Sequence, residues 1–133
     1  TQNGNQRGAY YLQYSKAYNA WAFVAPGTDD YGTGIYHHAN ATTAPQLNTW
    51  THLVGVYDAT NQTISLYVNG TLVSTASNIS TWPAGGPLTI GNAKVENPFP
   101  GKISDVQTWN TAFPAATVAA LKAGTQPTPV QLS

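Results

Sequence analysis

Carboxylate side chains are the first groups to consider for chemistry, because glycoside hydrolysis needs two of them about 5 to 9 Å apart across the scissile bond. The chain has five acidic residues: Asp29, Asp30, Asp58, Glu96 and Asp105. Only Asp29 and Asp30 are adjacent, and they lie in a loop with Pro and Gly, where turn formation is the usual role of Asp. No candidate strand carries two acids on one face. We therefore expect no catalysis by this chain alone.

The histidines do not form a metal-binding pattern. His37 and His38 are neighbours on a candidate strand, so their side chains point to opposite faces and cannot chelate one ion together. His52 lies on a half-buried candidate strand, which favours a hydrogen-bonded structural histidine. The absence of Cys excludes thiolate metal sites, a Cys nucleophile and disulfides. A Ser-His-Asp arrangement stays open, but no Gly-x-Ser-x-Gly elbow supports it.

Aromatic residues offer a different chemistry, because their faces stack on the apolar C–H face of a sugar while Asn, Gln or His side chains bond its hydroxyls. Alternation along the strands places four such residues opposite the more apolar face, and a fifth lies in a nearby loop. The five candidate carbohydrate-binding residues are Tyr11, Gln13, Tyr36, His38 and, in the loop, Tyr31. The alternative is cross-strand packing, the usual role of Tyr and Trp in a β-sandwich. We assign Trp21, Trp50 and Trp109 to the core and Trp82 to a loop anchor.

Strand signals dominate the elements that must position these residues, because short β-branched or aromatic runs alternate with Gly, Pro, Asn and Asp. The predicted strands span residues 9–15, 21–25, 34–40, 50–58, 63–68, 71–75, 87–91 and 101–109. Only 115–122 reads as a helix, with Pro114 at its start and Gly124 as its stop. Many short strands with regular turns predict one sandwich domain over residues 1–124, followed by a tail or linker over 125–133.

Two hairpins are predicted within this series. Asn69-Gly70 separates two alternating runs, and both residue types tolerate the positive φ that a type I′ turn requires. The runs 9–15 and 21–25 form a second hairpin across the turn-like residues 16–19.

Composition narrows the class of protein further. At 133 residues the chain is one domain, and five acids balance five bases, with charged residues only 8% of the total. This balance excludes the basic stripe of a nucleic-acid binder and the basic face of a membrane-surface helix. No apolar run approaches the roughly 18 residues of a spanning helix, so we expect a soluble domain without membrane insertion. Low charge with abundant Thr, Asn and Gly is typical of secreted, extracellular modules.

Four motifs follow one another in a fixed order between residues 48 and 121. They are 50–58 (WTHLVGVYD), 64–70 (ISLYVNG), 88–91 (LTIG) and 99–110 (FPGKISDVQTWN), with the candidate helix behind them. In this order they resemble the laminin-G-like family of the concanavalin A-like lectin/glucanase superfamily, whose members are appended to many bacterial extracellular proteins. The resemblance implies an all-β jelly-roll sandwich of antiparallel sheets with one short C-terminal helix.

The resemblance also implies a function. We expect a non-catalytic carbohydrate-binding or adhesion module of a secreted bacterial protein, with a glycan or polysaccharide as partner. The alternatives are a structural or interdomain spacer, and the non-catalytic part of a glycan-acting enzyme such as a glycoside hydrolase. A fold alone does not decide among these, because function belongs to the site that the fold carries.

Two further expectations follow from the resemblance. Related jelly rolls often bind structural Ca²⁺, which takes carboxylate and carbonyl oxygens from loops, and the candidate ligand is Asp105 with a carbonyl near Gly101. The alternative is that Asp105 is an ordinary strand residue, and Ser104 and Gln107 depart from the family's usual acidic and basic residues. Family members also begin with strands upstream of Thr1, so we expect open sheet edges and a companion polypeptide segment that completes the sandwich.

Overall fold

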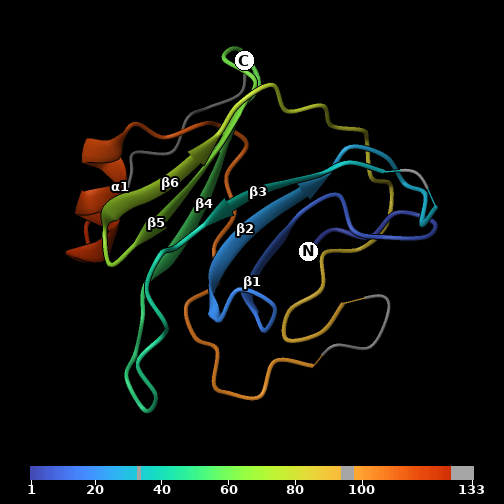
Figure 1. The fold of residues 1–133 in the computed structure, drawn as a ribbon. Coiled ribbons are helices and arrows are strands. Elements are labelled where there is room, and N and C mark those ends of the chain that lie inside the picture. The colour runs from blue at the N-terminus through green and yellow to red at the C-terminus, as the bar shows by residue number, and fades with distance from the viewer. Residues whose placement is uncertain (33, 94–97, 127–133) are drawn as a thin grey trace.

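The chain folds as two antiparallel sheets that face each other, as the computed structural model of residues 1–32, 34–93 and 98–126 shows (Figure 1). The first sheet contains, in spatial order, β1 (Tyr11–Ser15), β2 (Ala20–Pro26) and β3 (Tyr36–Asn40). The second contains β4 (Leu53–Asp58), β5 (Thr63–Val68) and β6 (Thr71–Ala76), and α1 (Ala115–Lys122) follows at the side of β6. The predicted all-β sandwich with one short C-terminal helix is confirmed.

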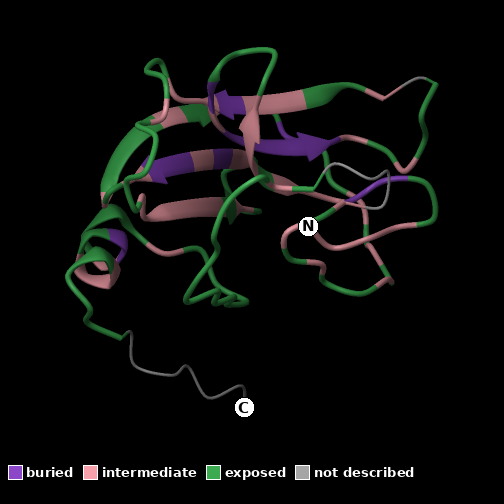
Figure 2. Cartoon of the chain, turned by 90° about the horizontal axis from the view of Figure 1, so that it is seen from below, coloured by how far each residue is buried: buried purple, intermediate pink, exposed green. Residues whose placement is uncertain are grey.

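Strand β2 is the centre of the first sheet. It pairs with β1 across the predicted hairpin, whose turn ends at Asn19 with a φ of 47°, and with β3 on its other side. Because β2 has a strand on each side and a sheet beneath it, its residues are almost all buried (Figure 2). Side chains of β1 and β3 therefore flank the side chains of β2 on each face of the sheet.

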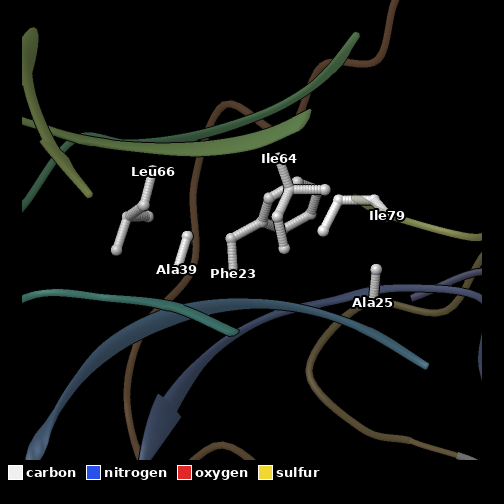
Figure 3. Packing of buried hydrophobic residues seen from close by; sticks show 6 residues of the cluster. All are labelled: Phe23, Ala25, Ala39, Ile64, Leu66 and Ile79. Carbon is white, nitrogen blue, oxygen red and sulfur yellow. The ribbon is translucent and has the colours of Figure 1, made fainter. Parts of the chain in front are cut away.

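The core lies between the two sheets (Figure 3). Phe23, Ala25 and Ala39 come from the first sheet, and Ile64 and Leu66 come from the second, each with an exposed fraction of 5% or less. Ile79, in the segment after β6, closes one end of this cluster. Except for Ile79, each member lies on a strand, and its neighbours in sequence point to the opposite face of the sheet.

The predicted Asn69-Gly70 turn is confirmed. Asn69 has a φ of 52° and Gly70 a φ of 82°, and Val68 pairs with Thr71 directly across the turn. The Asn69 side chain also fixes the turn to β4, because its Oδ1 accepts a hydrogen bond from the His52 N–H at 3.0 Å. The hairpin is thus tied to its neighbouring strand at its tip.

Replacing Gly70 by Val should destabilise the domain by about 1–3 kcal/mol, because a β-branched residue is strained at positive φ. A Cβ at this position would also lie 3.1 Å from Cβ of Lys122 on α1. Thermal or denaturant unfolding measures the loss. The matched control is Gly85→Val, because a Cβ at Gly85 would meet no atom within 4 Å. Equal stability of the two variants would contradict the turn's importance.

The helix α1 is confirmed with its predicted limits. Pro114 occupies the N-cap position with extended backbone, and Gly124 has the φ of 89° that stops a helix. Val118 is fully buried, so it anchors the helix to the sandwich. Of the predicted tail, residues 127–133 lie outside the described residues. Among the described residues, no helix has the length and apolar character to cross a bilayer.

Two predicted strands are wrong. Residues 87–91 form only an isolated bridge between Gln2 and Leu88, and residues 101–109 form no strand. The alternating pattern of 101–109 is interrupted at Asp105, whose φ of 54° breaks an extended run. A strand also needs a ladder partner, and this segment hydrogen bonds to none of the described strands.

Two of the four tryptophans lie where they were predicted, and two do not. Trp21 packs against the core, and Trp82 anchors its loop by donating from Nε1 to the Pro26 carbonyl oxygen at 3.1 Å. The core assignments of Trp50 and Trp109 are wrong, because these side chains are 67% and 40% exposed. Trp50 precedes β4 rather than lying in it, and Trp109 belongs to the segment that forms no strand.

One side of the sandwich is open. In the described part of the chain, β1 and β4 each have a strand on one side only, and they line a wide groove together with Phe99 and residues 102–113. Apolar side chains in this groove, such as Leu12 and Val106, are 39% and 48% exposed. Open edges are therefore present as expected, and the companion segment that would cover them stays a prediction.

Candidate functional site

The predicted binding residues of the strands share the face of the first sheet that points away from the core. Val24 of β2 pairs with Tyr11 of β1 and with His38 of β3, so these three residues form one row across the sheet. Gln13 lies two residues after Tyr11 on β1, and Tyr36 lies two residues before His38 on β3. Both therefore share this face of the sheet. We call this surface the outer face: Tyr11, Gln13, Tyr36 and His38, with Tyr31 beside it.

Tyr31 joins the outer face through a residue that the sequence interpretation missed. The guanidinium carbon of Arg7 lies 5.3 Å from the ring centroid of Tyr31 and 4.8 Å from that of Tyr36. Arg7 is the only arginine of the chain and is 1% exposed. Its position in a polar N-terminal run gave no sign of burial, because nothing local in the sequence indicates that this run returns to the outer face.

The Arg7 side chain is buried with unused hydrogen-bond donors. Nε and Nη1 are both inaccessible and have no hydrogen-bond partner among the described residues. Gly34 makes room for this group, because a Cβ there would lie 2.9 Å from Nη1. Such a charge normally demands a partner, since burial of an uncompensated cation is costly.

Asp29 holds the N-terminal segment in place. Its carboxylate accepts hydrogen bonds from the backbone N–H groups of Asn5 at 2.6 Å, Gln6 at 2.9 Å and Arg7 at 2.8 Å. Asp30 accepts from the Gly32 N–H at 2.9 Å, which is the turn role expected of it. The adjacent acids therefore organise loops, and Asp29 determines where Arg7 enters the outer face.

The remaining acids do not join a shared site. Asp58 accepts from the Thr60 and Asn61 N–H groups, and these hydrogen bonds lower its pKa, those from Asn61 most strongly. Glu96 lies outside the described residues. Asp58 thus stabilises the turn between β4 and β5.

The Asp105 carboxylate is exposed and accepts a hydrogen bond from Ser104 Oγ at 3.0 Å. Residues 1–32, 34–93 and 98–126 contain no cluster of three or more His, Cys, Asp and Glu side chains that could hold a metal. One carboxylate is far short of the six to eight oxygens that Ca²⁺ takes. Calcium at Asp105 stays a prediction from the resemblance.

The adjacent histidines point to opposite faces, as predicted. His37 Nε2 lies 3.4 Å from Ser80 Oγ, whereas the His38 ring packs between Tyr18 and Tyr36 at centroid distances of 5.6 and 6.1 Å. Burial, followed by the nearby His37, lowers the pKa of His38 below 6.5. Its ring is therefore neutral at pH 7, and its buried Nδ1 has no hydrogen-bond partner in the described part of the chain.

His52 is structural, but not through its ring. Its backbone N–H and C=O bond the Oδ1 and N–H of Asn69, while its ring Nδ1 is buried without a partner among the residues described. Burial, followed by the charge of Lys122, lowers its pKa. The hydrogen bonds of His52 to Asn69 are therefore made by its backbone.

Comparisons with known proteins agree with this architecture. A family model described as the concanavalin A-like lectin/glucanases superfamily matches residues 1–119. The pentraxin-related protein PTX3 of Homo sapiens and that of Bos taurus are each 32% identical to the chain over 94 residues, which cover 68% of the chain. The matched part spans only 23% of the length of each relative. No solved structure matches the chain.

Proposed function

Because the chain belongs to the laminin-G-like family of the concanavalin A-like lectin/glucanases superfamily, we propose that it is a non-catalytic carbohydrate-binding or adhesion module with the outer face as its binding surface. Its setting, in this proposal, is a secreted bacterial protein, which its low charge and its content of Thr, Asn and Gly support.

The observation that carries the proposal is the row formed by Tyr11, Val24 and His38. The short Val24 side chain lies between two polar rings, and the hydrogen-bonded register fixes the spacing of those rings. Tyr36, 46% exposed, extends this surface toward the Tyr31 loop. Exposed aromatic faces beside amide and imidazole groups are the elements with which proteins stack on sugars and bond their hydroxyls.

The positions of the carboxylates support a non-catalytic role. Asp29 and Asp58 each accept three hydrogen bonds from N–H groups of neighbouring loops, so they serve turn and loop structure. Strands β1, β2 and β3 carry no acidic residue, so none of their side chains can supply the paired carboxylates that glycoside hydrolysis requires.

A binding screen tests the proposal. The domain is incubated with insoluble polysaccharides and with a glycan array, and affinity for any retained sugar is measured by calorimetry with competition by the free sugar. We expect Tyr36→Ala and Tyr11→Ala each to weaken that binding about tenfold or more, because about 1.4 kcal/mol of lost stacking and hydrogen bonding is tenfold in affinity.

The matched control is Tyr57→Ala. Tyr57 is also a half-exposed strand tyrosine, 38% accessible, but it lies on β4 and contacts Thr81 through its hydroxyl. If Tyr57→Ala weakens binding as much as Tyr36→Ala, the outer face is not the binding surface. If no glycan is retained by the intact domain, a structural spacer becomes the better reading. Hydrolysis of any substrate by the domain would favour an enzyme.

A further inference from the structure

The buried guanidinium of Arg7 has a feature that cross-strand packing alone does not explain. Its guanidinium carbon lies over the rings of Tyr31 and Tyr36, where cation–π attraction operates. Such ring contacts supply no oxygen or nitrogen acceptor for the guanidinium N–H groups. Nε and Nη1 accordingly have no hydrogen-bond acceptor among the described residues, although both are buried.

The strands of the outer face bring no carboxylate to this cation. Asp29 bonds the backbone N–H of Arg7, and the strands beneath carry no acid. Tyr11 lies close enough for the Arg7 charge to act on its hydroxyl, whose pKa is nevertheless raised, mainly by burial. That hydroxyl stays protonated at neutral pH and accepts a hydrogen bond from the Gly8 N–H at 2.7 Å, so its own O–H is a second donor beside Arg7.

We propose that Arg7 makes the outer face selective for sugars that carry an anionic substituent, a carboxylate or a sulfate ester. The inference rests on the proposed glycan-binding function and names its substrate class. An anion at the edge of the guanidinium would receive its in-plane N–H groups, in the charge-assisted and often bidentate geometry that Arg forms with carboxylates and related oxyanions.

The position of Arg7 beneath two tyrosines supplies a route for such a group. Arg7, Tyr31 and Tyr36 line the same groove, and the two rings are 54% and 46% exposed. A sugar stacked on the outer face would bring its substituent to the gap between these rings. In this proposal the exposed Tyr31 side chain moves aside to admit the anion, and the attraction of opposite charges in a partly desolvated site offsets the lost ring contact.

Paired polymers that differ only in charge test the inference. The probes are polygalacturonate against its carboxyl-reduced form, and dextran sulfate against dextran, at one fixed ionic strength. We expect the unmodified domain to bind the acidic member of at least one pair about tenfold or more tightly than the neutral member. The pair that shows the preference tells a carboxylate from a sulfate.

Two variants address Arg7 itself. Arg7→Gln removes the charge, and Gly34→Ala keeps it but places a Cβ 2.9 Å from Nη1, so the guanidinium must move. Both should abolish the acidic preference, measured as the ratio of the affinities for the acidic and the neutral polymer. Lys16→Gln removes one exposed charge from the β1–β2 turn and should leave the preference unchanged, which controls for general attraction of polyanions.

The outcomes separate this inference from the proposed function. Equal binding of the acidic and neutral members by the unmodified domain would overturn the role of Arg7 and leave carbohydrate binding intact. Retention of the acidic preference in Gly34→Ala would also overturn it, even if Arg7→Gln fails to fold. Absence of binding to these polymers and to the wider glycan screen would overturn both proposals.

Discussion

Replacing Phe23 by Ala should lower the free energy of unfolding by about 3–5 kcal/mol, the cost of a lost core aromatic and the cavity that it leaves. Phe23 is 5% exposed and stands between the two sheets, where it contacts the core cluster and the Tyr10 ring at 6.2 Å. A domain of this size has only about 5–15 kcal/mol in total, so the variant should be marginally folded. Chemical denaturation measures the change.

The control for this prediction is Leu47→Ala. Leu47 is also a large apolar residue, but it is 87% exposed, so its truncation should change stability by about 0.5 kcal/mol or less. Comparable losses in the two variants would show that Phe23 does not pack as described.

A substitution at Gly55 tests the contact between the Phe23 ring and β4 more specifically. A Cβ at Gly55 of β4 would lie 2.6 Å from Cδ2 of Phe23, so the ring rests directly on the β4 backbone. Gly55→Ala should therefore cost about 1–3 kcal/mol through overpacking. In Phe23→Leu the smaller side chain leaves space, and Gly55→Ala should cost less in that background. Additive effects within about 0.5 kcal/mol would rule out this contact.

The fold was predictable wherever local pattern and pairing agree. Alternation placed Tyr11 and His38 opposite the more apolar face of their strands, and the register puts both in one row with Val24, because side-chain direction in a strand has a period of two. Asn69-Gly70 was predictable because few residues tolerate two successive positive φ angles. Both inferences need only a short stretch of sequence.

The rest depended on contacts between distant segments. Residues 101–109 alternate as a strand would, but alternation does not supply a neighbouring strand, and the segment has none in the described structure. Trp is a residue type that is common in protein cores, but Trp50 lies outside β4 and is exposed. Arg7 was not predictable because the residues around it, Asp29 and Tyr36, are more than twenty positions away.

Asp29 makes such distant contacts, because it bonds the segment that carries Arg7. Asp29→Ala should lower the free energy of unfolding by about 2–4 kcal/mol. Three backbone N–H groups, at Asn5, Gln6 and Arg7, would lose a charged acceptor. Each hydrogen bond to a charged group contributes about 1.5–3 kcal/mol, and water offsets part of the loss at the exposed positions. The amide protons of residues 5–7 should also exchange faster with solvent, while those of β5 keep their protection.

Asp58→Ala is the control, because this carboxylate also accepts hydrogen bonds from loop N–H groups. Asp58 also accepts three, but from Thr60 and Asn61, two and three residues away in an exposed turn. Its loss should cost much less than the loss of Asp29, because water replaces the exposed carboxylate and no distant segment is released. The Asp29 bonds span 22 to 24 residues, so their loss frees the segment that carries Arg7. Equal costs for the two variants, or unchanged exchange at residues 5–7, would mean that Arg7 is held by its tyrosine contacts and not by Asp29.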